Sequence, residues 1–224
     1  QFDGTIFNSS SVAVTDRWNN GDEGKYLNLA KNESGTSYYV RVFNNPSGVG
    51  SSTMEFTRGT LFLRFSFRNL DSSDQPFFDS GGTLVGANRL VILRSATTGY
   101  LTLKFNDSDT VSLNTQWILT FDTITLDAST IYSLIVTWGE SGLDAWLNGT
   151  QISLTQMPGP IVSGDAGFDS SRPLTTDFWR TPTSSAIRIG RDILGNFSDI
   201  NFYAFYMWDT QLQSVERDEI FADP

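Results

Sequence analysis

The sequence contains no cysteine and no histidine among its 224 residues. Without cysteine the chain has neither disulfides nor thiolate chemistry, and it carries no signature of a redox compartment. Without histidine it lacks the usual base that activates serine and cysteine nucleophiles, and the commonest ligand of zinc and copper. The two absences therefore exclude histidine-dependent nucleophilic enzymes and nearly all zinc or copper sites.

Long apolar runs and an excess of positive charge are also missing. No apolar stretch approaches the roughly 18 residues that mark a membrane-spanning helix, so we expect no membrane insertion. The formal net charge is -10 and the pI about 4.3, which repels phosphate backbones and makes nucleic acid an unexpected partner. The chain begins at Gln1 without an apolar leader. We therefore expect a processed protein or a domain of a longer one.

What the chain does contain is typical of β-sheet proteins. Aromatic residues make up 13% and there are 19 glycines. Between Leu61 and Phe67 apolar side chains recur at every second position, which predicts a half-buried strand with one polar face. Similar short runs, separated by turn residues, continue to Trp138 and beyond. This spacing predicts one antiparallel β-sandwich that comprises residues 1–224 as a single domain.

The segment from Ala186 to Phe221 predicts how the domain ends. A short strand is followed by a turn and by the run from Ile200 to Trp208, whose apolar residues lie on both faces and predict a central strand covered on both sides. Ser214 is the predicted cap of a closing helix. Three apolar residues are expected to pack that helix onto the sheets: Leu212, Val215 and Ile220.

This order of parts resembles the end of a concanavalin A-like, laminin G-type jelly roll. The segment Ile131–Leu154 also matches the pattern, because a strand ending in Trp138 leads into a hairpin with an Asn148-Gly149 turn. The resemblance covers residues 59–221 and implies an all-β, two-sheet antiparallel jelly roll with a short C-terminal helix. It implies no particular activity, since laminarinase-like hydrolases and alginate lyase-like enzymes use the same fold.

The longest segment without clear periodicity, Thr155 to Ser185, is the predicted binding loop. It combines an aromatic face, which suits sugar C–H groups, with planar polar side chains, which suit sugar hydroxyls. The alternatives are that Phe178 and Trp179 only pin the loop to the sandwich, or that the loop contacts another subunit. The predicted ligand-binding residues are Asp165, Asp169, Arg172, Asp177, Trp179 and Arg180.

Calcium is the one cofactor for which the sequence offers ligands. Asp71 and Asp74 lie in one predicted loop, and Asp107 and Asp109 in another, where carboxylates suit a hard cation. Some laminin G-type domains carry a calcium ion at the rim, so the resemblance points the same way. The alternative is that these are ordinary acidic turns, because no EF-hand spacing is present.

The function expected from these features is a non-catalytic recognition module. It would bind a glycan or a cell-surface receptor through rim loops, as part of an extracellular, cell-surface or virion-surface protein. One alternative is a polysaccharide-degrading hydrolase or lyase, which predicts a groove holding two facing carboxylates or a tyrosine with an arginine. Another is a structural or oligomerisation domain of a fibre or capsid, which predicts a large apolar interface.

Overall fold

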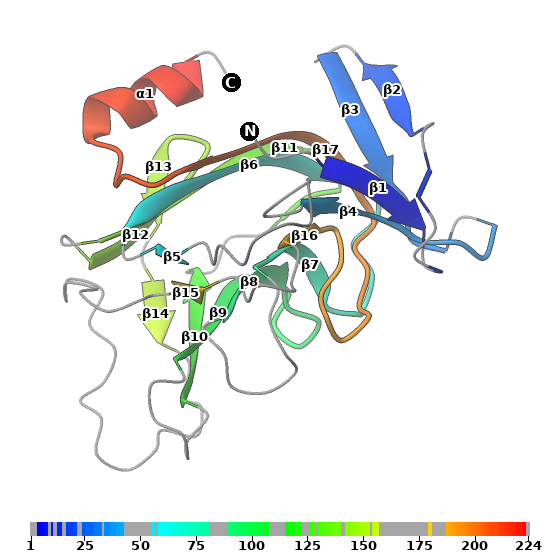
Figure 1. The fold of residues 1–224 in the computed structure, drawn as a ribbon, viewed down its shortest axis with the longest axis horizontal. Helices are drawn as coiled ribbons and strands as arrows, with labels where there is room; N and C mark the ends of the chain where they lie inside the picture. The colour runs from blue at the N-terminus through cyan, green and yellow to red at the C-terminus, as the bar shows by residue number, and fades with distance from the viewer. Residues whose placement is uncertain are drawn as a thin grey trace, which may run out of the picture.

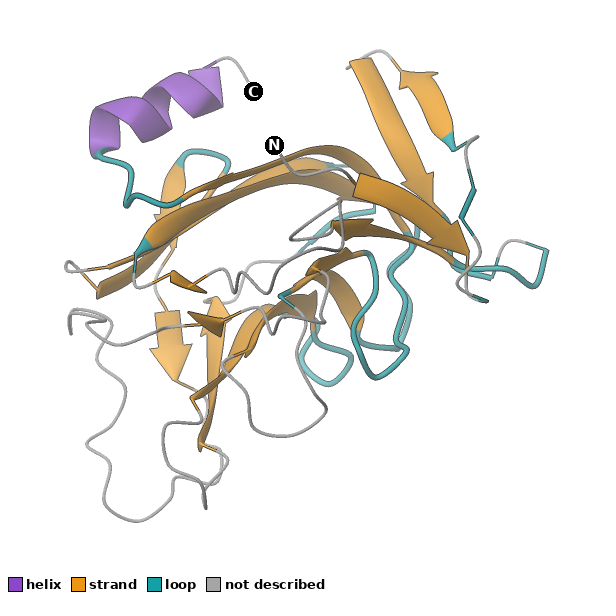
Figure 2. Ribbon diagram, in the orientation of Figure 1, coloured by secondary structure: helices purple, strands orange, loops and turns teal. Residues whose placement is uncertain are grey.

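The computed structural model describes residues 4–8, 10, 13–14, 17–21, 24–32, 34–42, 55–56, 58–80, 89–107, 115–121, 126–128, 130–139, 142–152, 154–156, 179–180 and 187–222. Within this part of the chain two antiparallel sheets face each other, and a helix follows the last strand (Figures 1 and 2). The predicted all-β, two-sheet jelly roll with a short C-terminal helix is confirmed.

The first sheet has eight strands in the order β1-β4-β16-β7-β8-β9-β10-β14. Its strands are β1 (Gly4–Asn8), β4 (Tyr38–Val42), β7 (Gln75–Asp79), β8 (Arg89–Arg94), β9 (Leu101–Asp107), β10 (Thr115–Phe121), β14 (Leu154–Gln156) and β16 (Ile187–Ile189).

The second sheet has seven strands in the order β13-β12-β11-β6-β17-β3-β2. Its strands are β2 (Trp18–Gly21), β3 (Gly24–Leu29), β6 (Gly59–Phe67), β11 (Ile131–Gly139), β12 (Gly142–Leu147), β13 (Thr150–Ile152) and β17 (Ile200–Trp208). A separate two-stranded sheet joins β5 (Glu55–Phe56) to β15 (Trp179–Arg180), and the helix α1 spans Ser214–Ala222.

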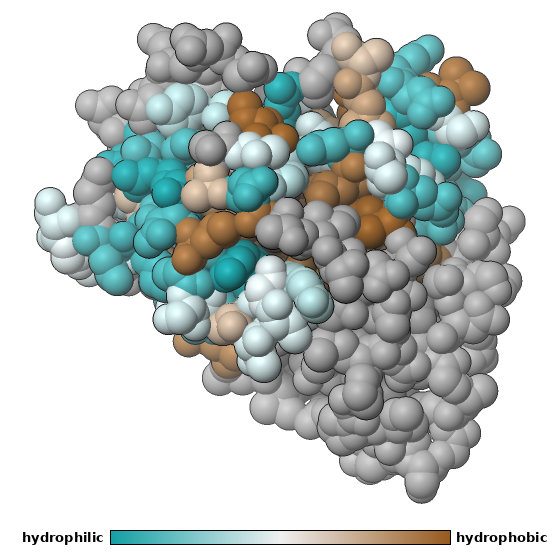
Figure 3. All heavy atoms as spheres, turned by 180° about the vertical axis from the view of Figure 1, so that it is seen from behind, coloured by the Kyte–Doolittle hydropathy of each residue, from teal (hydrophilic) through white to brown (hydrophobic). Residues whose placement is uncertain are grey.

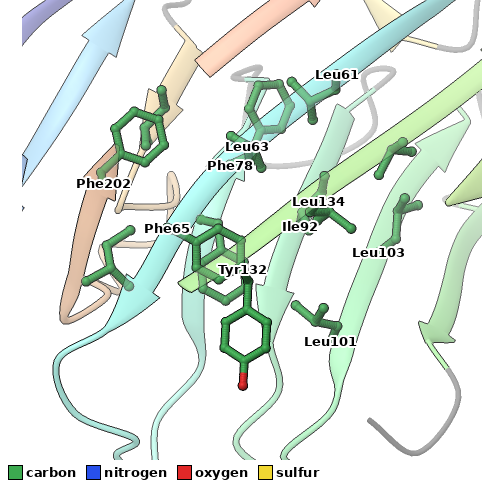
Figure 4. Close-up of a cluster of buried hydrophobic side chains, with 14 of the residues drawn as sticks. Leu61, Leu63, Phe65, Phe78, Ile92, Leu101, Leu103, Tyr132, Leu134 and Phe202 are labelled. Atoms are coloured by element: carbon green, nitrogen blue, oxygen red, sulfur yellow. The ribbon is translucent and has the colours of Figure 1, made fainter. Parts of the chain in front are cut away.

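The hydrophobic core fills the space between the two large sheets, because alternate side chains of each strand point inward. Figure 4 shows leucine and aromatic side chains of β6 and β11 facing those of β8 and β9. Phe65 of β6 stacks on Phe77 of β7 with ring centroids 4.4 Å apart. At the start of β6 a β-carbon on Gly59 would lie 2.5 Å from Cζ2 of the buried Trp138, so only glycine allows this packing.

The Asn148-Gly149 turn confirms the predicted hairpin. Asn148 has a φ of 49° and Gly149 a φ of 79°, and the turn joins β12 to β13. Both central residues are thus left-handed, as the tight two-residue hairpin turn requires. The Asn148 side chain also accepts a hydrogen bond from the backbone N–H of Ser133, over 2.7 Å.

Two expectations for individual strands are wrong. The strand Gly59–Phe67 has no exposed polar face, because Phe62 on its outer face is fully buried and stacks against Tyr206 of β17, with centroids 5.9 Å apart. Conversely, β17 is not covered on both sides, since Tyr206 is 56% exposed.

The closing helix is capped by Gln213 and not by Ser214. The Gln213 backbone N–H donates to the carboxylate of Glu216, and its carbonyl accepts the first helical hydrogen bond, from Arg217. Leu212 is buried as expected, but Val215 is 67% exposed and does not pack the helix onto the sheet. Arg217 makes the contact instead, with its guanidinium carbon 3.9 Å from the ring centroid of Trp146.

The strand register distinguishes two ends of the sandwich. We refer to the end where β6 and β8 begin, and where β7 and β9 finish, as the leading end. The opposite end, where β6 finishes and β7 begins, is the trailing end. The stacking of Phe65 on Phe77 and of Phe205 on Phe78 aligns the two sheets in this sense.

Candidate functional site

The predicted binding loop is anchored at the leading end. Within it β15 pairs Trp179 with Phe56 and Arg180 with Glu55, and it lies next to β8. Phe56 shortly precedes Gly59, where β6 begins, so the Trp179–Arg180 segment belongs to the leading end. The side chains of these two residues are outside the described part of the chain. So are the remaining predicted ligand residues, Asp165, Asp169, Arg172 and Asp177, whose role stays a prediction.

One predicted calcium ligand, Asp71, has a different set of partners at the trailing end. The Lys31 ammonium is 2.6 Å from Asp71 Oδ2, and it also donates to the hydroxyl of Ser73. Asp71 Oδ1 accepts from the backbone N–H and the hydroxyl of Ser73, over 2.9 and 2.6 Å. Burial opposes ionisation of this carboxyl, but the hydrogen bonds from Lys31 and Ser73 outweigh it and lower the pKa of Asp71 below its usual value.

The two predicted calcium pairs lie too far apart to share an ion. Asp74 accepts a hydrogen bond from the backbone N–H of Ala96 over 2.7 Å at the trailing end. Asp107 is the last residue of β9 at the leading end. Because strands rise about 3.3 Å per residue, the length of β9 separates them by about 20 Å. Asp109 is outside the described residues. Within the described part of the chain, no three carboxylates lie close enough together to hold a metal ion.

A group of arginines that we did not predict lies on the outer face of the eight-stranded sheet. Val40, Ile187, Ile189 and Phe78 point into the core. Their neighbours Arg41, Arg188 and Asp79 therefore point outward. The register places these three in one row, with Arg188 of β16 directly opposite Arg41 of β4 on one side and Asp79 of β7 on the other. Directly opposed residues in an antiparallel ladder have α-carbons about 4.5–5.5 Å apart.

A third arginine reaches this row from the loop that follows β16. Arg191 places its guanidinium carbon 4.9 Å from the ring centroid of Tyr39, which belongs to the same face of β4 as Arg41, and equally far from that of Phe197. The loop is held down by Asp79, whose Oδ2 accepts the backbone N–H of Ile193 over 2.7 Å. We refer to Arg41, Arg188 and Arg191, with Asp79 and Tyr39 beneath them, as the arginine cluster.

Burial and neighbouring charges act on Arg188 in the arginine cluster. Burial lowers the pKa of Arg188 from its usual value; the charge of Asp79 opposes this shift, and the charges of Arg41 and Arg191 add to it. In the described part of the chain one carboxylate, that of Asp79, shares the row with three guanidinium groups. Asp192 is adjacent in sequence, but its two carboxylate oxygens accept from the backbone and side-chain N–H groups of Asn196. The row thus brings guanidinium groups of neighbouring strands together around the buried carboxylate of Asp79.

The sequence held one signal for this cluster. Arg41 and Arg188 each lie between two β-branched residues, valine in one case and isoleucine in the other, which is typical of a strand. An arginine that becomes buried in a strand is usually paired with an opposite charge. Such a sequence pattern does not predict which strands become neighbours in the sheet. The juxtaposition arises only from the order β4-β16-β7, which brings together segments far apart along the chain.

A second unpredicted feature is a row of aromatic rings on the outer face of the seven-stranded sheet. Tyr26 lies 5.5 Å from Tyr203, centroid to centroid, and Tyr206 lies 5.9 Å from Trp208 as well as from the buried Phe62. Figure 1 shows α1 on this same outer side of the sheet, with the β2–β3 hairpin rising at the edge of the sheet. Tyr206 is exposed and Tyr26, Tyr203 and Trp208 are half-buried, so the row forms a partly exposed aromatic surface on the sheet that does not carry the arginine cluster.

The fold is shared with domains of known structure. Domain 4 of AbnA, a GH43 extracellular arabinanase from Geobacillus stearothermophilus, in complex with arabinotriose, matches 97% of this chain and 87% of its own, with a TM-score of 0.57 and 12% identity. A tailspike protein 2 enzymatically active domain from bacteriophage CBA120 matches 98% of this chain and 30% of its own (TM-score 0.61, 11% identity).

Botulinum neurotoxin type C, whose cell entry depends upon interaction with two ganglioside molecules, matches 99% of this chain and 46% of its own (TM-score 0.54, 13% identity). This chain therefore spans less than half of the neurotoxin and tailspike chains that it matches. No family model and no curated protein matches the sequence. No helix in the described residues has both the length and the hydrophobicity to cross a membrane. At such low identities, the comparisons establish a common sandwich fold.

Proposed function

We propose that this protein is a non-catalytic recognition module that binds glycans at the leading end of the sandwich. The ligand would contact the six predicted residues of the loop, Trp179 and Arg180 foremost, and the module would serve an extracellular, cell-surface or virion-surface protein of the laminin G-type group. Calcium bound at the loop of Asp107 and Asp109 remains part of this proposal, whereas the Lys31 ammonium already neutralises Asp71 in the other loop.

The observation that carries the proposal is the position of β15. It holds Trp179 and Arg180 in an extended segment that pairs with Glu55–Phe56 and adjoins β8, so the loop brings an aromatic residue and a planar cation to one end of the sandwich. An aromatic face beside planar hydrogen-bonding groups is the combination that saccharides require. The arabinotriose complex of a similar domain supports the proposal by analogy of fold.

The experiment is a glycan array probed with the wild-type protein and two matched aromatic variants. Trp179→Ala is expected to lose binding to every glycan that the wild-type protein retains, by about tenfold or more. Tyr206→Ala removes an exposed ring from the other sheet and should leave binding unchanged. Equal loss in both variants, or loss in Tyr206→Ala alone, would move the site to the aromatic row and overturn the assignment to the leading end.

A polysaccharide-degrading enzyme is the second candidate, because the contact between Tyr39 and Arg191 brings two of its expected residue types together. Tyr39 is 1% exposed, however, which counts against direct contact with a polysaccharide. Incubation with a polysaccharide panel, followed by reducing-end release and by absorbance of unsaturated sugars, tests this candidate. Sustained turnover of any polysaccharide would replace the recognition proposal by an enzymatic one.

The structural or oligomerisation role receives less support from the surface. Seen from behind, hydrophobic side chains of the described residues form small patches separated by hydrophilic ones (Figure 3). The large exposed hydrophobic residues of the described part, Leu194, Tyr206 and Val215, come from a loop, a strand and the helix. Obligate interfaces are larger and more continuous than this.

A further inference from the structure

We propose that Tyr206 and Trp208 of the aromatic row bind an arginine-containing basic segment of a partner protein. This site lies on the outer face of the seven-stranded sheet and is independent of the glycan-binding proposal. The two rings would stack on a guanidinium group of the segment. Carboxylates that follow the rings in the chain would pair with its other positive charges.

The first argument is the geometry of the two rings. Phe205 and Met207 pack against the core, so their neighbours at positions 206 and 208 point outward. Tyr206 stacks on the fully buried Phe62, with ring centroids 5.9 Å apart and planes inclined by 29°, and is still 56% exposed. The Trp208 ring is 5.9 Å from the Tyr206 ring and inclined to it by 36°. The pair therefore presents a supported aromatic surface to solvent.

The second argument is that the same face of the sheet already holds an arginine of this chain. Arg217 of α1 places its guanidinium carbon 3.9 Å from the ring centroid of Trp146. From this contact the strand register continues one row of outward residues across four strands: Trp146, Ile135, Phe62 and Tyr206. Neighbouring strands lie about 4.8 Å apart, so the row is about 14 Å long. Within the described residues no cation lies over Tyr206, at the other end of the row.

The third argument is the charge beside the rings. Asp209 directly follows Trp208, and the hydroxyl of Thr60 fixes the turn after it by donating to the carbonyl of Thr210 over 2.9 Å. Residues 209–222 carry four exposed carboxylates and a single basic residue, Arg217. The four carboxylates belong to Asp209, Glu216, Asp218 and Glu219.

The rest of this face does not reverse the excess of negative charge. Asp144 of β12 adds a fifth carboxylate, and the other two arginines are Arg64 of β6 and Arg58, which precedes that strand. Five carboxylates thus stand against three arginines, and one of these arginines is already stacked on Trp146. The surface is complementary in charge to a basic partner.

These features favour a basic partner over a second copy of the chain. A symmetric pair places the same patch of each copy against the other, so the acidic segment 209–222 would meet itself and like charges would oppose association. Arginine suits the rings better than lysine, because its planar guanidinium group stacks on an aromatic face. An extended segment rises about 3.3 Å per residue, so about four or five residues span the row.

The test titrates the intact protein with three labelled peptides of equal length, an oligo-arginine, an oligo-lysine and an oligo-glutamine, and follows fluorescence anisotropy. The wild-type protein is expected to bind the oligo-arginine several-fold more tightly than the oligo-lysine, and the oligo-glutamine most weakly. Tyr206→Ala should weaken oligo-arginine binding about fivefold to tenfold. The control Tyr100→Ala, which removes a half-buried ring just before β9 at the trailing end, should leave it unchanged.

Two matched charge variants separate this site from general attraction to an acidic protein. Asp209→Asn should weaken oligo-arginine binding several-fold. Asp127→Asn makes the same change in net charge at an exposed residue near the trailing end, where β11 begins, and should have no effect. Equal losses in the two variants would mean that net charge alone attracts the peptide, and would overturn the inference.

A further variant and one measurement keep the test decisive. Tyr206→Leu retains an apolar cover over Phe62 if Tyr206→Ala folds poorly, and should abolish the preference for arginine over lysine. Equal affinity of the wild-type protein for the two basic peptides would overturn the role of the rings. Sedimentation that revealed a dimer disrupted by Tyr206→Leu would assign the rings to a second copy and overturn the inference as well. None of these results depends on the glycan array, so the two proposals fail separately.

Discussion

Two charged groups at different places in the sandwich differ in how many like charges they bring together. At the trailing end Lys31 faces Asp71, and Ser73 completes the hydrogen bonds of the carboxylate. In the arginine cluster Arg188 stands opposite Arg41 on one side and the buried Asp79 on the other. The first group, the matched pair, is a single ion pair that joins two loops. The second combines like and opposite charges on neighbouring strands, so its members act on one another as a network.

The largest expected difference between the two groups concerns their carboxylates. Asp79→Ala removes a fully buried acceptor and leaves the Ile193 N–H and the Arg188 guanidinium without it. We expect a loss of about 3–5 kcal/mol in the free energy of unfolding. Asp71→Ala breaks a partly exposed pair and should cost about 1 kcal/mol. Urea unfolding of both variants measures the difference, and equal losses would show that burial does not separate the two groups.

Replacing a cation should change the free energy of unfolding in opposite directions in the two groups. Lys31→Gln removes the partner of Asp71 and should lower the free energy of unfolding by about 1 kcal/mol. Arg41→Gln relieves the repulsion from Arg188 and should leave stability unchanged or raise it by roughly 0.5 kcal/mol. Chemical unfolding in low salt measures both signs. A clear loss of stability in Arg41→Gln would mean that its charge is already compensated within the protein.

The smallest expected effect is a pH dependence confined to the matched pair. The folded state lowers the pKa of Asp71, so this group stabilises the fold above its unfolded pKa of about 3.9. The contribution is lost as pH falls through the lower, folded value. The stability difference between the wild-type protein and Lys31→Gln should therefore be constant near neutral pH and vanish well below pH 4. A difference that persists in strong acid would contradict the ionic account of this pair.

The sequence predicted the fold well because local alternation and turn chemistry carry that information. The run around Leu61–Phe67, the Asn148-Gly149 turn and the closing helix all appear where the pattern placed them. The exposure of individual faces was predicted poorly. The burial of Phe62 depends on its contact with Tyr206 of β17, which is distant in sequence. The alternation of residues within β6 does not predict which side chains of the neighbouring strand will cover it.

The predicted ligand residues stay a prediction, and the arginine cluster was not predicted for a related reason. The pairing of β15 with β5 brings Trp179 and Arg180 to the sandwich end, which agrees with a rim position. The arginine cluster depends on a strand order that joins β4, β16 and β7, and each arginine taken alone looks like an isolated charge in a strand. Register, which fixes such neighbours, is a property of the assembled sheet.

The most direct test of the proposed function is to map where a glycan binds. Backbone amide shifts, recorded by NMR during titration with the tightest-binding glycan of the array, report on both ends of the sandwich at once. We expect saturable shifts at Trp179 and Arg180 and at Glu55–Phe56, which pair with them, and none at Lys31 or at residues 71–74. Shifts confined to the trailing end, or to the aromatic row around Tyr206, would contradict the assignment of the ligand site to the leading end.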